Sequence, residues 1–264
     1  MPTKPPQIIA ALHLPPFPGS NHPDRRSLVE IRDYALRNVE FAVKAGLTGL
    51  YLQDLGDHPV APLVPTHVVA GMAAIGSAVR TAFPDLSLGV CLMSHGAREP
   101  LAIAQAIGAQ FVRLKVYVGV MIKAEGMLQG CAYEAIQYRA QIGAEHISIL
   151  ADVYDRTGSP LGQFPLAEEA RWAATFGRAD GLILTGQSFD ETLQMMSEVR
   201  QAKLDVPLLI GGGVTDQNVH QALQVADSVI VSTAFKPVGG WTRESLMADW
   251  DLAKIRAFVA AAGL

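Results

Sequence analysis

The sequence predicts an α/β fold built as a single (β/α)8 (TIM) barrel that occupies residues 1–264. The first observation is a regular alternation of short apolar runs with longer amphipathic stretches, which is typical of parallel strands joined by helices. The second is their number, because eight strand–helix units account for the whole chain. A doubly wound open sheet shows the same alternation, but eight units leave no residues for a second domain.

Each expected strand is an apolar run that ends near polar or turn-forming residues. These runs are 7–14, 48–54, 86–93, 111–118, 148–155, 181–186, 207–212 and 228–235. The expected helices lie at 28–45, 66–83, 97–107, 131–142, 166–176, 190–202, 216–224 and 251–261. Gly46, Gly108 and Gly143 directly follow three of these helical stretches, where a left-handed C-cap favours glycine.

Composition limits the classes of function. Half of the residues are hydrophobic and 17% are charged, so the chain can bury a large core and does not read as disordered. The net charge of −4 argues against a nucleic-acid partner. Cys91 and Cys131 are too few for a disulfide framework or a four-cysteine metal site, so we expect two buried thiols in a cytoplasmic protein.

The sequence has no run of about 18 apolar residues, so we expect no helix that spans a membrane. The apolar run 8–14 is interrupted by His13 and leads into Pro15 and Pro16, which does not resemble a signal peptide. Composition leaves two further interactions open, namely peripheral attachment to a membrane and assembly into a homo-oligomer.

Polar residues that alternate with aliphatic ones along a strand are expected to face the barrel interior. Near the carboxyl ends of the strands this pattern places His13, Gln53, Lys115, Tyr117, Asp152, Tyr154 and Thr185, with Arg113 deeper. The candidate catalytic residues of this group are Lys115, Asp152, His13 and Gln53.

Charged side chains are rarely buried without a partner, so Asp152 should form an ion pair. We expect Lys115 to lie within reach of it on the adjacent strand, with Arg113 as the alternative partner. One interpretation is that such a pair only fills the barrel, and the other is an acid–base group beside a substrate. A Schiff base on Lys115 would require a lowered pKa, which a sequence does not reveal.

A glycine-rich turn gives the strongest chemical signal. Residues 208–215 (LLIGGGVT) run from a strand toward a helix, and Ser232 and Thr233 follow the next strand. Loops after strands 7 and 8 form the recurrent phosphate site of this fold, where backbone N–H groups and a helix dipole hold the anion. Thr215 is the expected N-cap. The predicted phosphate-binding residues are Gly212, Gly213, Ser232 and Thr233, the alternative being a tight turn alone.

No metal site and no cofactor are assigned. Asp54, Asp57 and His58 follow the second strand and have the oxygen and nitrogen ligands that a divalent ion accepts, but ordinary loop capping explains them better. The other histidines lack ligand spacing.

Two long loops should lie at the carboxyl end of the barrel, 119–130 and 236–250. In an enzyme they would close over the mouth, with Glu125 and Lys236 at the rim. In a scaffold they would form an apolar docking surface instead, with these side chains exposed: Met121, Met127, Trp241 and Trp250.

Several blocks occur together in this sequence. They are 13–20 (HLPPFPGS), 53–57 (QDLGD), 111–114 (FVRL), 119–121 (GVM), 125–126 (EG), 151–153 (ADV), 179–186 (ADGLILTG), the turn 211–218 and Lys236. Their combination resembles the BtpA/SgcQ family. The resemblance covers about residues 7–260 and implies a barrel. It also implies two different roles, because the family is named for a peripheral thylakoid factor of photosystem I biogenesis while other members resemble sugar-metabolism proteins.

The polar lining departs from the family pattern. Gln53-Asp54 stands where the family tends to have Glu-Asn, and Lys115 and Tyr117 stand where it tends to have Asn and His. The Asn-rich turn after the third strand is 93–95 (MSH) here, and the basic segment after the fifth is 155–158 (DRTG). The scaffold is therefore kept while either the substrate differs or an ancestral catalysis has been lost.

Three functions follow from these observations. The first is an enzyme or binding protein for a small phosphorylated metabolite, a sugar phosphate or a nucleotide-derived compound. The second is a peripheral membrane biogenesis factor that uses the barrel as a scaffold. The third is a catalytically inactive barrel that binds a metabolite. A polar mouth favours the first, and exposed apolar patches favour the second.

Overall fold

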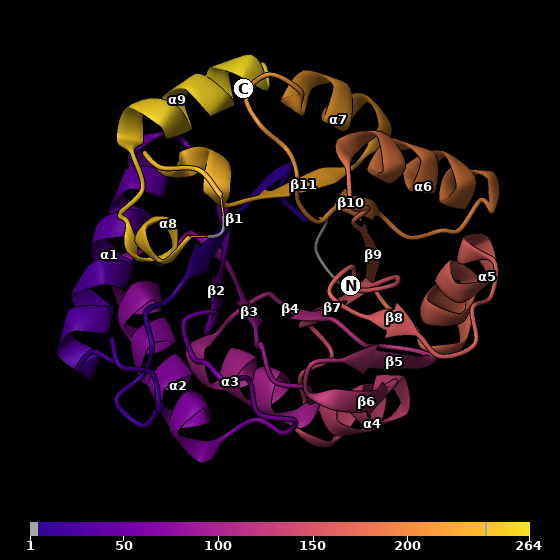
Figure 1. Cartoon of the computed structure of the whole chain (residues 1–264), viewed down its shortest axis with the longest axis horizontal. Coiled ribbons are helices and arrows are strands. Elements are labelled where there is room, and N and C mark those ends of the chain that lie inside the picture. Colours follow the sequence, from indigo (N-terminus) through magenta and orange to yellow (C-terminus); the bar gives the residue numbers. More distant parts are fainter. Residues whose placement is uncertain (1–4, 241) are drawn as a thin grey trace.

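The computed structural model describes residues 5–240 and 242–264, and they form a closed barrel of parallel strands surrounded by helices (Figure 1). The ring order is β1-β11-β10-β9-β7-β4-β3-β2, and β1 closes it by pairing with both β2 and β11. The strands are β1 (Ile8–His13), β2 (Gly49–Gln53), β3 (Ser87–Cys91), β4 (Phe111–Leu114), β7 (Ser148–Asp152), β9 (Gly181–Leu184), β10 (Leu208–Ile210) and β11 (Ser228–Val231). The predicted fold class is confirmed.

The helices form an outer ring around the strands (Figure 1). They are α1 (Leu28–Lys44), α2 (Thr66–Ala82), α3 (Arg98–Ile107), α4 (Ala132–Gln141), α5 (Leu166–Arg171), α6 (Phe189–Gln201), α7 (Val219–Val225), α8 (Arg243–Met247) and α9 (Leu252–Ala261). A π-helical turn, Trp172–Phe176, continues α5, and a 3-10 turn, Thr233–Phe235, follows β11. Gly46, Gly108 and Gly143 all have positive φ angles, as the expected C-caps require.

Two apolar layers hold the barrel together. Leu50 and Leu52 face outward into the core between strands and helices, whereas Tyr51 faces the interior. The interior is filled by Ile9, Ala11, Tyr51, Cys91, Phe111, Leu150, Ile183, Leu209 and Ile230. A Cβ on Gly89 would lie 2.2 Å from the Phe111 ring, so this glycine makes room for that ring at the centre.

The range 119–130 is a β-hairpin rather than an irregular loop. Strands β5 (Val120–Lys123) and β6 (Gly126–Gln129) pair antiparallel, and β8 (Ser159–Pro160) joins the other edge of β5. We call these three strands the arm sheet. Its inner face packs Met121 and Leu128 on Val116, while Ile122 and Met127 are paired on the exposed face.

Two predicted strands end earlier than expected, and this corrects two predicted lining residues. β4 ends at Leu114, after which Tyr117 turns outward into the helix layer and its hydroxyl donates to the Gly177 carbonyl. β7 ends at Asp152, and Tyr154 has a φ of +55°, which points its hydroxyl to the backbone of Phe164. Alternation along a strand predicts direction only while the chain stays extended.

The described part of the chain contains no helix that is long and apolar enough to cross a membrane.

Candidate functional site

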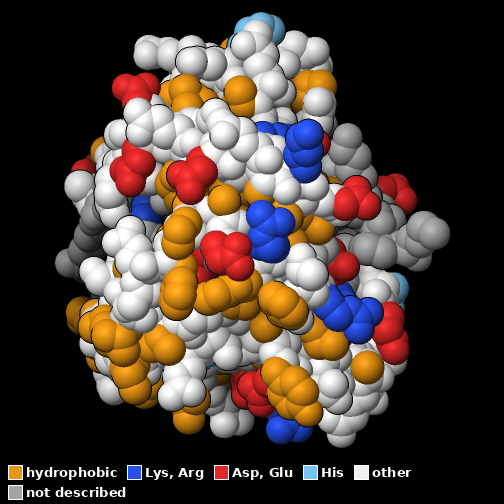
Figure 2. Space-filling model, turned by 90° about the vertical axis from the view of Figure 1, so that its right-hand side faces the viewer, with side chains coloured by type: hydrophobic (Ala, Val, Ile, Leu, Met, Phe, Trp, Pro, Cys, Tyr) orange, Lys and Arg blue, Asp and Glu red, His pale blue; other side chains and the backbone are white. Residues whose placement is uncertain are grey.

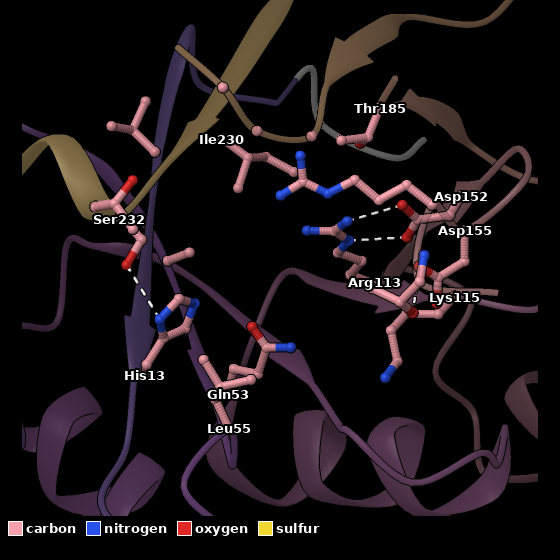
Figure 3. A pocket seen from close by; sticks show the side chains of 18 of the residues that line it. His13, Gln53, Leu55, Arg113, Lys115, Asp152, Asp155, Thr185, Ile230 and Ser232 are labelled. Atoms are coloured by element: carbon pink, nitrogen blue, oxygen red, sulfur yellow. Dashed lines mark hydrogen bonds and ion pairs between the residues drawn. The ribbon is translucent and has the colours of Figure 1, made fainter. Parts of the chain in front are cut away.

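A cavity of about 620 Å3, lined by charged and polar side chains among apolar ones, opens at the carboxyl ends of the strands (Figure 3). Every barrel strand contributes a lining residue at or just beyond its end: His13, Gln53, Met93, Lys115, Asp152, Thr185, Gly211 and Ser232. The cavity thus brings together all four candidate catalytic residues and all four predicted phosphate-binding residues, Gly212, Gly213, Ser232 and Thr233.

Asp152 is paired with Arg113, not with Lys115. The Arg113 Nε and Nη2 atoms lie 2.8 and 2.7 Å from the two carboxylate oxygens, and Nη1 donates to the Tyr51 hydroxyl at 2.9 Å. The Asp152 side chain is 3% exposed and that of Arg113 is 14% exposed. Burial disfavours the guanidinium charge, yet the Asp152 carboxylate holds the Arg113 pKa well above its usual value. Burial raises the pKa of Asp152 although the Arg113 charge lowers it, so the assignment of an ion pair rests on the bidentate geometry. The expected Lys115–Asp152 ion pair is wrong.

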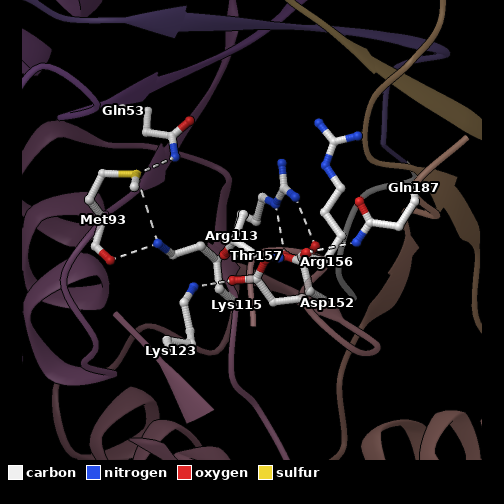
Figure 4. A network of polar contacts seen from close by, with 10 residues as sticks. Gln53, Met93, Arg113, Lys115, Lys123, Asp152, Arg156, Thr157 and Gln187 are labelled. Carbon is white, nitrogen blue, oxygen red and sulfur yellow. Dashed lines mark hydrogen bonds and ion pairs between the residues drawn. The ribbon is translucent and has the colours of Figure 1, made fainter. Parts of the chain in front are cut away.

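Lys115 instead donates to a backbone carbonyl. Its Nζ atom lies 2.6 Å from the Met93 carbonyl oxygen and 3.8 Å from the Met93 sulfur, which the Gln53 amide also contacts at 3.2 Å (Figure 4). Burial lowers the pKa of Lys115. The sequence could not supply this direction, because it depends on burial of the amine outweighing the nearby Asp155 and Asp54 carboxylates, which raise its pKa.

His13 forms a hydrogen bond with a predicted phosphate-binding residue. Its Nδ1 atom lies 3.3 Å from the Ser232 hydroxyl (Figure 3). Burial, reinforced by the charges of Lys236 and Arg113, lowers the pKa of His13 to about 3. A neutral imidazole with so low a pKa is a weak base, so the pair orients polar groups in the cavity rather than activating the serine as a nucleophile.

The glycine turn after β10 approaches the ligand space closely. A Cβ on Gly211 would lie 2.1 Å from the Thr185 hydroxyl, and Gly213 has a φ of +79°. In the part of the chain that the structure describes, the N–H groups of Gly212 and Gly213 make no hydrogen bond, and the buried Thr185 Oγ1 has no partner. Two backbone N–H groups of the cavity wall are therefore available to a ligand, and the Thr185 hydroxyl, buried beside Gly211, has unused hydrogen-bonding capacity.

The expected helix dipole does not contribute here. α7 begins only at Val219, and Asn218 occupies its N-cap in place of Thr215. The Asn218 side chain accepts from the Thr215 N–H and donates to the Gly213 carbonyl, which fixes the turn. The helix start is displaced because this side chain stabilises a separate turn first.

Arg156 is a cavity residue that sequence reasoning did not select. Its Nη2 atom lies 3.5 Å from the position of a Cβ on Gly212, so the guanidinium stands over the glycine turn. Among the described residues no carboxylate forms an ion pair with it. The one available signal was an arginine just beyond the end of a strand.

The backbone of Arg156 is fixed from two sides. Asp155 pairs with Lys123 of the arm sheet and accepts from the Thr157 N–H at 3.0 Å. The Gln187 amide donates to the Arg156 carbonyl at 3.0 Å (Figure 4). Although burial alone would raise it, Lys123 lowers the pKa of Asp155, which therefore stays ionised. The arm sheet thus places the arginine at the cavity.

The long loops do not cover the mouth in this conformation. No described residue of 119–130 or 236–250 lines the cavity, and Lys236 is buried with its amine donating to the Ser245 carbonyl, away from the expected rim position. The alternative expectation is met only in part, because Met127 is exposed whereas Met121 and Trp250 are buried. Trp241 lies outside the described residues.

No group of three or more metal-ligating side chains occurs among the residues that the structure places. Asp54 accepts from the Met93 N–H, and burial raises its pKa to about 6. Asp57 lies 3.0 Å from the His67 Nε2 atom. These contacts fit the capping interpretation of this segment.

The fold and the cavity define a class of protein, a (β/α)8 barrel with a ligand-sized polar cavity at its carboxyl mouth. The chain belongs to the BtpA family, whose model matches residues 4–263. It is similar to the "Photosystem I biogenesis protein BtpA" of Synechocystis, with 29% identity over 235 residues that cover 88% of this chain and 81% of that protein.

Solved structures share the fold at low identity. One described as "Native KDPGal structure" has a TM-score of 0.56 and 16% identity, and covers 96% of this chain and 93% of its own. Phosphoribosyl anthranilate isomerase from Thermus thermophilus has a TM-score of 0.55 and 13% identity, and the match covers 97% of this chain and 98% of that one. These likenesses establish the barrel and nothing about the substrate.

The Arg113–Asp152 pair gives a first prediction. Arg113→Met leaves the Asp152 carboxylate buried without its partner, so the free energy of unfolding should fall by about 3–5 kcal/mol in urea denaturation. The double variant Arg113→Met/Asp152→Leu removes both charges and should recover most of that loss. If Arg113→Met unfolds at the same urea concentration as the parent, the pair does not stabilise the barrel.

Proposed function

We propose that this barrel binds a small phosphorylated metabolite at its carboxyl mouth, with the phosphate held by Gly212, Gly213, Arg156 and Thr185. The observation that carries the proposal is the Arg156 guanidinium, which stands over a glycine turn whose N–H groups have no partner in the described chain. Backbone N–H groups and a bidentate arginine are the usual ligands of a phosphate.

The charges of the cavity wall also favour an anion. Three cationic residues line it, and only Arg113 is matched by a carboxylate, that of Asp152. The other lining carboxylate, Asp155, is already paired with Lys123. Lys115 and Arg156 therefore leave an excess of positive charge, which an anionic ligand would neutralise.

The size and the remaining lining suit a compact, hydroxylated ligand. A volume of about 620 Å3 lies within the range of small-molecule sites. Away from the phosphate end, His13, Gln53 and Lys115 offer hydrogen-bonding groups to a sugar or a nucleotide-derived compound. The same groups serve an enzyme and an inactive metabolite-binding barrel alike.

Arg156→Gln tests the phosphate site. The variant should bind glycerol 3-phosphate and ribose 5-phosphate about 10–100-fold more weakly than the parent in titration calorimetry, because it loses a charge-assisted hydrogen bond of about 1.5–3 kcal/mol. Arg32→Gln is the matched control, since Arg32 pairs with Asp33 on the exposed surface of α1. Equal affinity in both variants, or equal binding of unphosphorylated ribose, would count against the site.

A second candidate function is that of a membrane-associated assembly factor. The observation in its favour is an apolar patch on the arm sheet and the segment after β8, formed by Ile122, Met127, Leu161 and Phe164, each at least 43% exposed. Figure 2 views this side of the molecule, where hydrophobic side chains gather between charged ones. Exposed patches of this kind mark interaction surfaces.

The double variant Ile122→Ser/Leu161→Ser tests that candidate. Under the assembly-factor interpretation the parent should co-sediment with phosphatidylglycerol–phosphatidylcholine vesicles and the variant should not, because the patch supplies the apolar contact area. Val29→Ser/Val43→Ser, which removes exposed apolar side chains from α1, is the control. If the parent itself stays in solution, the patch has no affinity for lipid.

A further inference from the structure

Lys115 is the one lysine among the described residues that lines the cavity. Its amine contacts a carbonyl oxygen and a thioether sulfur of Met93, and it forms no ion pair within the described chain. The two carboxylates of the cavity form ion pairs with other cations. Asp152 pairs with Arg113, and Asp155 pairs with Lys123. The Lys115 amine therefore lies at the cavity wall and takes part in no ion pair that stabilises the described barrel.

The other lysines contrast with it. Lys123 is buried in its ion pair with Asp155, and Lys236 is buried outside the cavity with its amine on the Ser245 carbonyl. Lys44, Lys203 and Lys254 are exposed on the surface. A small carbonyl compound bound in the cavity would therefore meet one lysine amine among the residues that the structure describes.

We propose that Lys115 forms an imine with the carbonyl carbon of an open-chain phosphorylated aldehyde or ketone whose phosphate lies at Arg156 and the glycine turn. This inference rests on the proposed function, because it uses the same phosphate site to place the substrate. It names the substrate class as a carbonyl-bearing phosphate ester, such as the open-chain form of a sugar phosphate.

The step balances without a further reactant. The Lys115 nitrogen forms a bond to the carbonyl carbon, the carbon–oxygen double bond becomes a hydroxyl in the carbinolamine, and both amine hydrogens finally leave with that oxygen as water. The product is a carbon–nitrogen double bond that takes up one proton when it becomes an iminium ion. An iminium withdraws electrons from the adjacent carbon, which then loses a proton or a carbon substituent more readily.

The electrostatics of the cavity favour a nucleophilic amine. Burial lowers the pKa of Lys115 and the Lys123 ammonium acts in the same direction, and together they outweigh Cys91, Asp155 and Asp54, which raise it. Only the neutral amine attacks a carbonyl, so a lowered pKa raises the reactive fraction near neutral pH. Below that pKa the reactive fraction falls about tenfold for each pH unit, which gives the imine a defined pH dependence.

Borohydride trapping tests the inference in the unaltered protein. The protein is incubated with glyceraldehyde 3-phosphate or dihydroxyacetone phosphate, reduced with sodium borohydride, digested and mapped by mass spectrometry. The expected adduct lies on Lys115, forms at higher yield than with glyceraldehyde or dihydroxyacetone, and is suppressed by glycerol 3-phosphate. Adducts spread over Lys44, Lys203 and Lys254 with none on Lys115 would overturn the inference.

Lys115→Arg is the matched variant, because it keeps the positive charge and cannot form an imine. It should lose the trapped adduct, and a urea unfolding transition like that of the parent shows that the variant is folded. If the parent binds glycerol 3-phosphate in an Arg156-dependent way but traps nothing, the imine is wrong and the phosphate site stands. If Lys115 is trapped equally by phosphorylated and unphosphorylated carbonyls and glycerol 3-phosphate does not bind, the phosphate site is wrong and the amine chemistry stands.

Discussion

The bidentate contact between Arg113 and Asp152 determines what the cavity can do. It joins β4 to β7 at the floor of the cavity and satisfies both carboxylate oxygens. Because Asp152 is paired with Arg113, neither Lys115 nor Arg156 has a carboxylate partner among the described residues. A charge pair below the ligand space thus leaves a positive wall above it, which is the electrostatic condition for holding a phosphorylated compound.

The arm sheet supplies the second condition, which is position. Its Lys123 holds Asp155, and the adjacent Arg156 then has a fixed backbone from which its side chain reaches the glycine turn. Contacts between the arm and the barrel therefore pre-organise a cation that would otherwise move with a surface loop. The arm sheet also carries an exposed apolar patch. The ligand site and any docking surface therefore share this one sheet.

Much of the barrel could be predicted from local pattern. Alternation identified His13, Gln53 and Thr185 as cavity residues because their strands remain extended up to those positions. It failed for Tyr117 and Tyr154, whose strands end earlier because the chain turns into the arm sheet and its neighbours. The register of β4 and β7 places Arg113 beside Leu150 rather than Asp152, so the partner of Asp152 depends on which cationic side chain reaches the carboxylate, which the sequence does not show.

Arg156 could not be ranked from the sequence, because its position depends on contacts with residues far along the chain, Lys123 and Gln187. Arg156 and Lys115 are the two cationic side chains of the cavity that form no ion pair within the described residues, and a local pattern gives no measure of that.

The central claim is that the glycine turn after β10 and Arg156 together hold a phosphate. The most direct measurement is a crystal structure of the protein grown with a saturating concentration of ribose 5-phosphate. The account predicts phosphate density between the Arg156 guanidinium and the N–H groups of Gly212 and Gly213, within hydrogen-bond distance of the Thr185 hydroxyl. Ligand density with the phosphate elsewhere in the cavity, or an empty cavity at saturation, would contradict it.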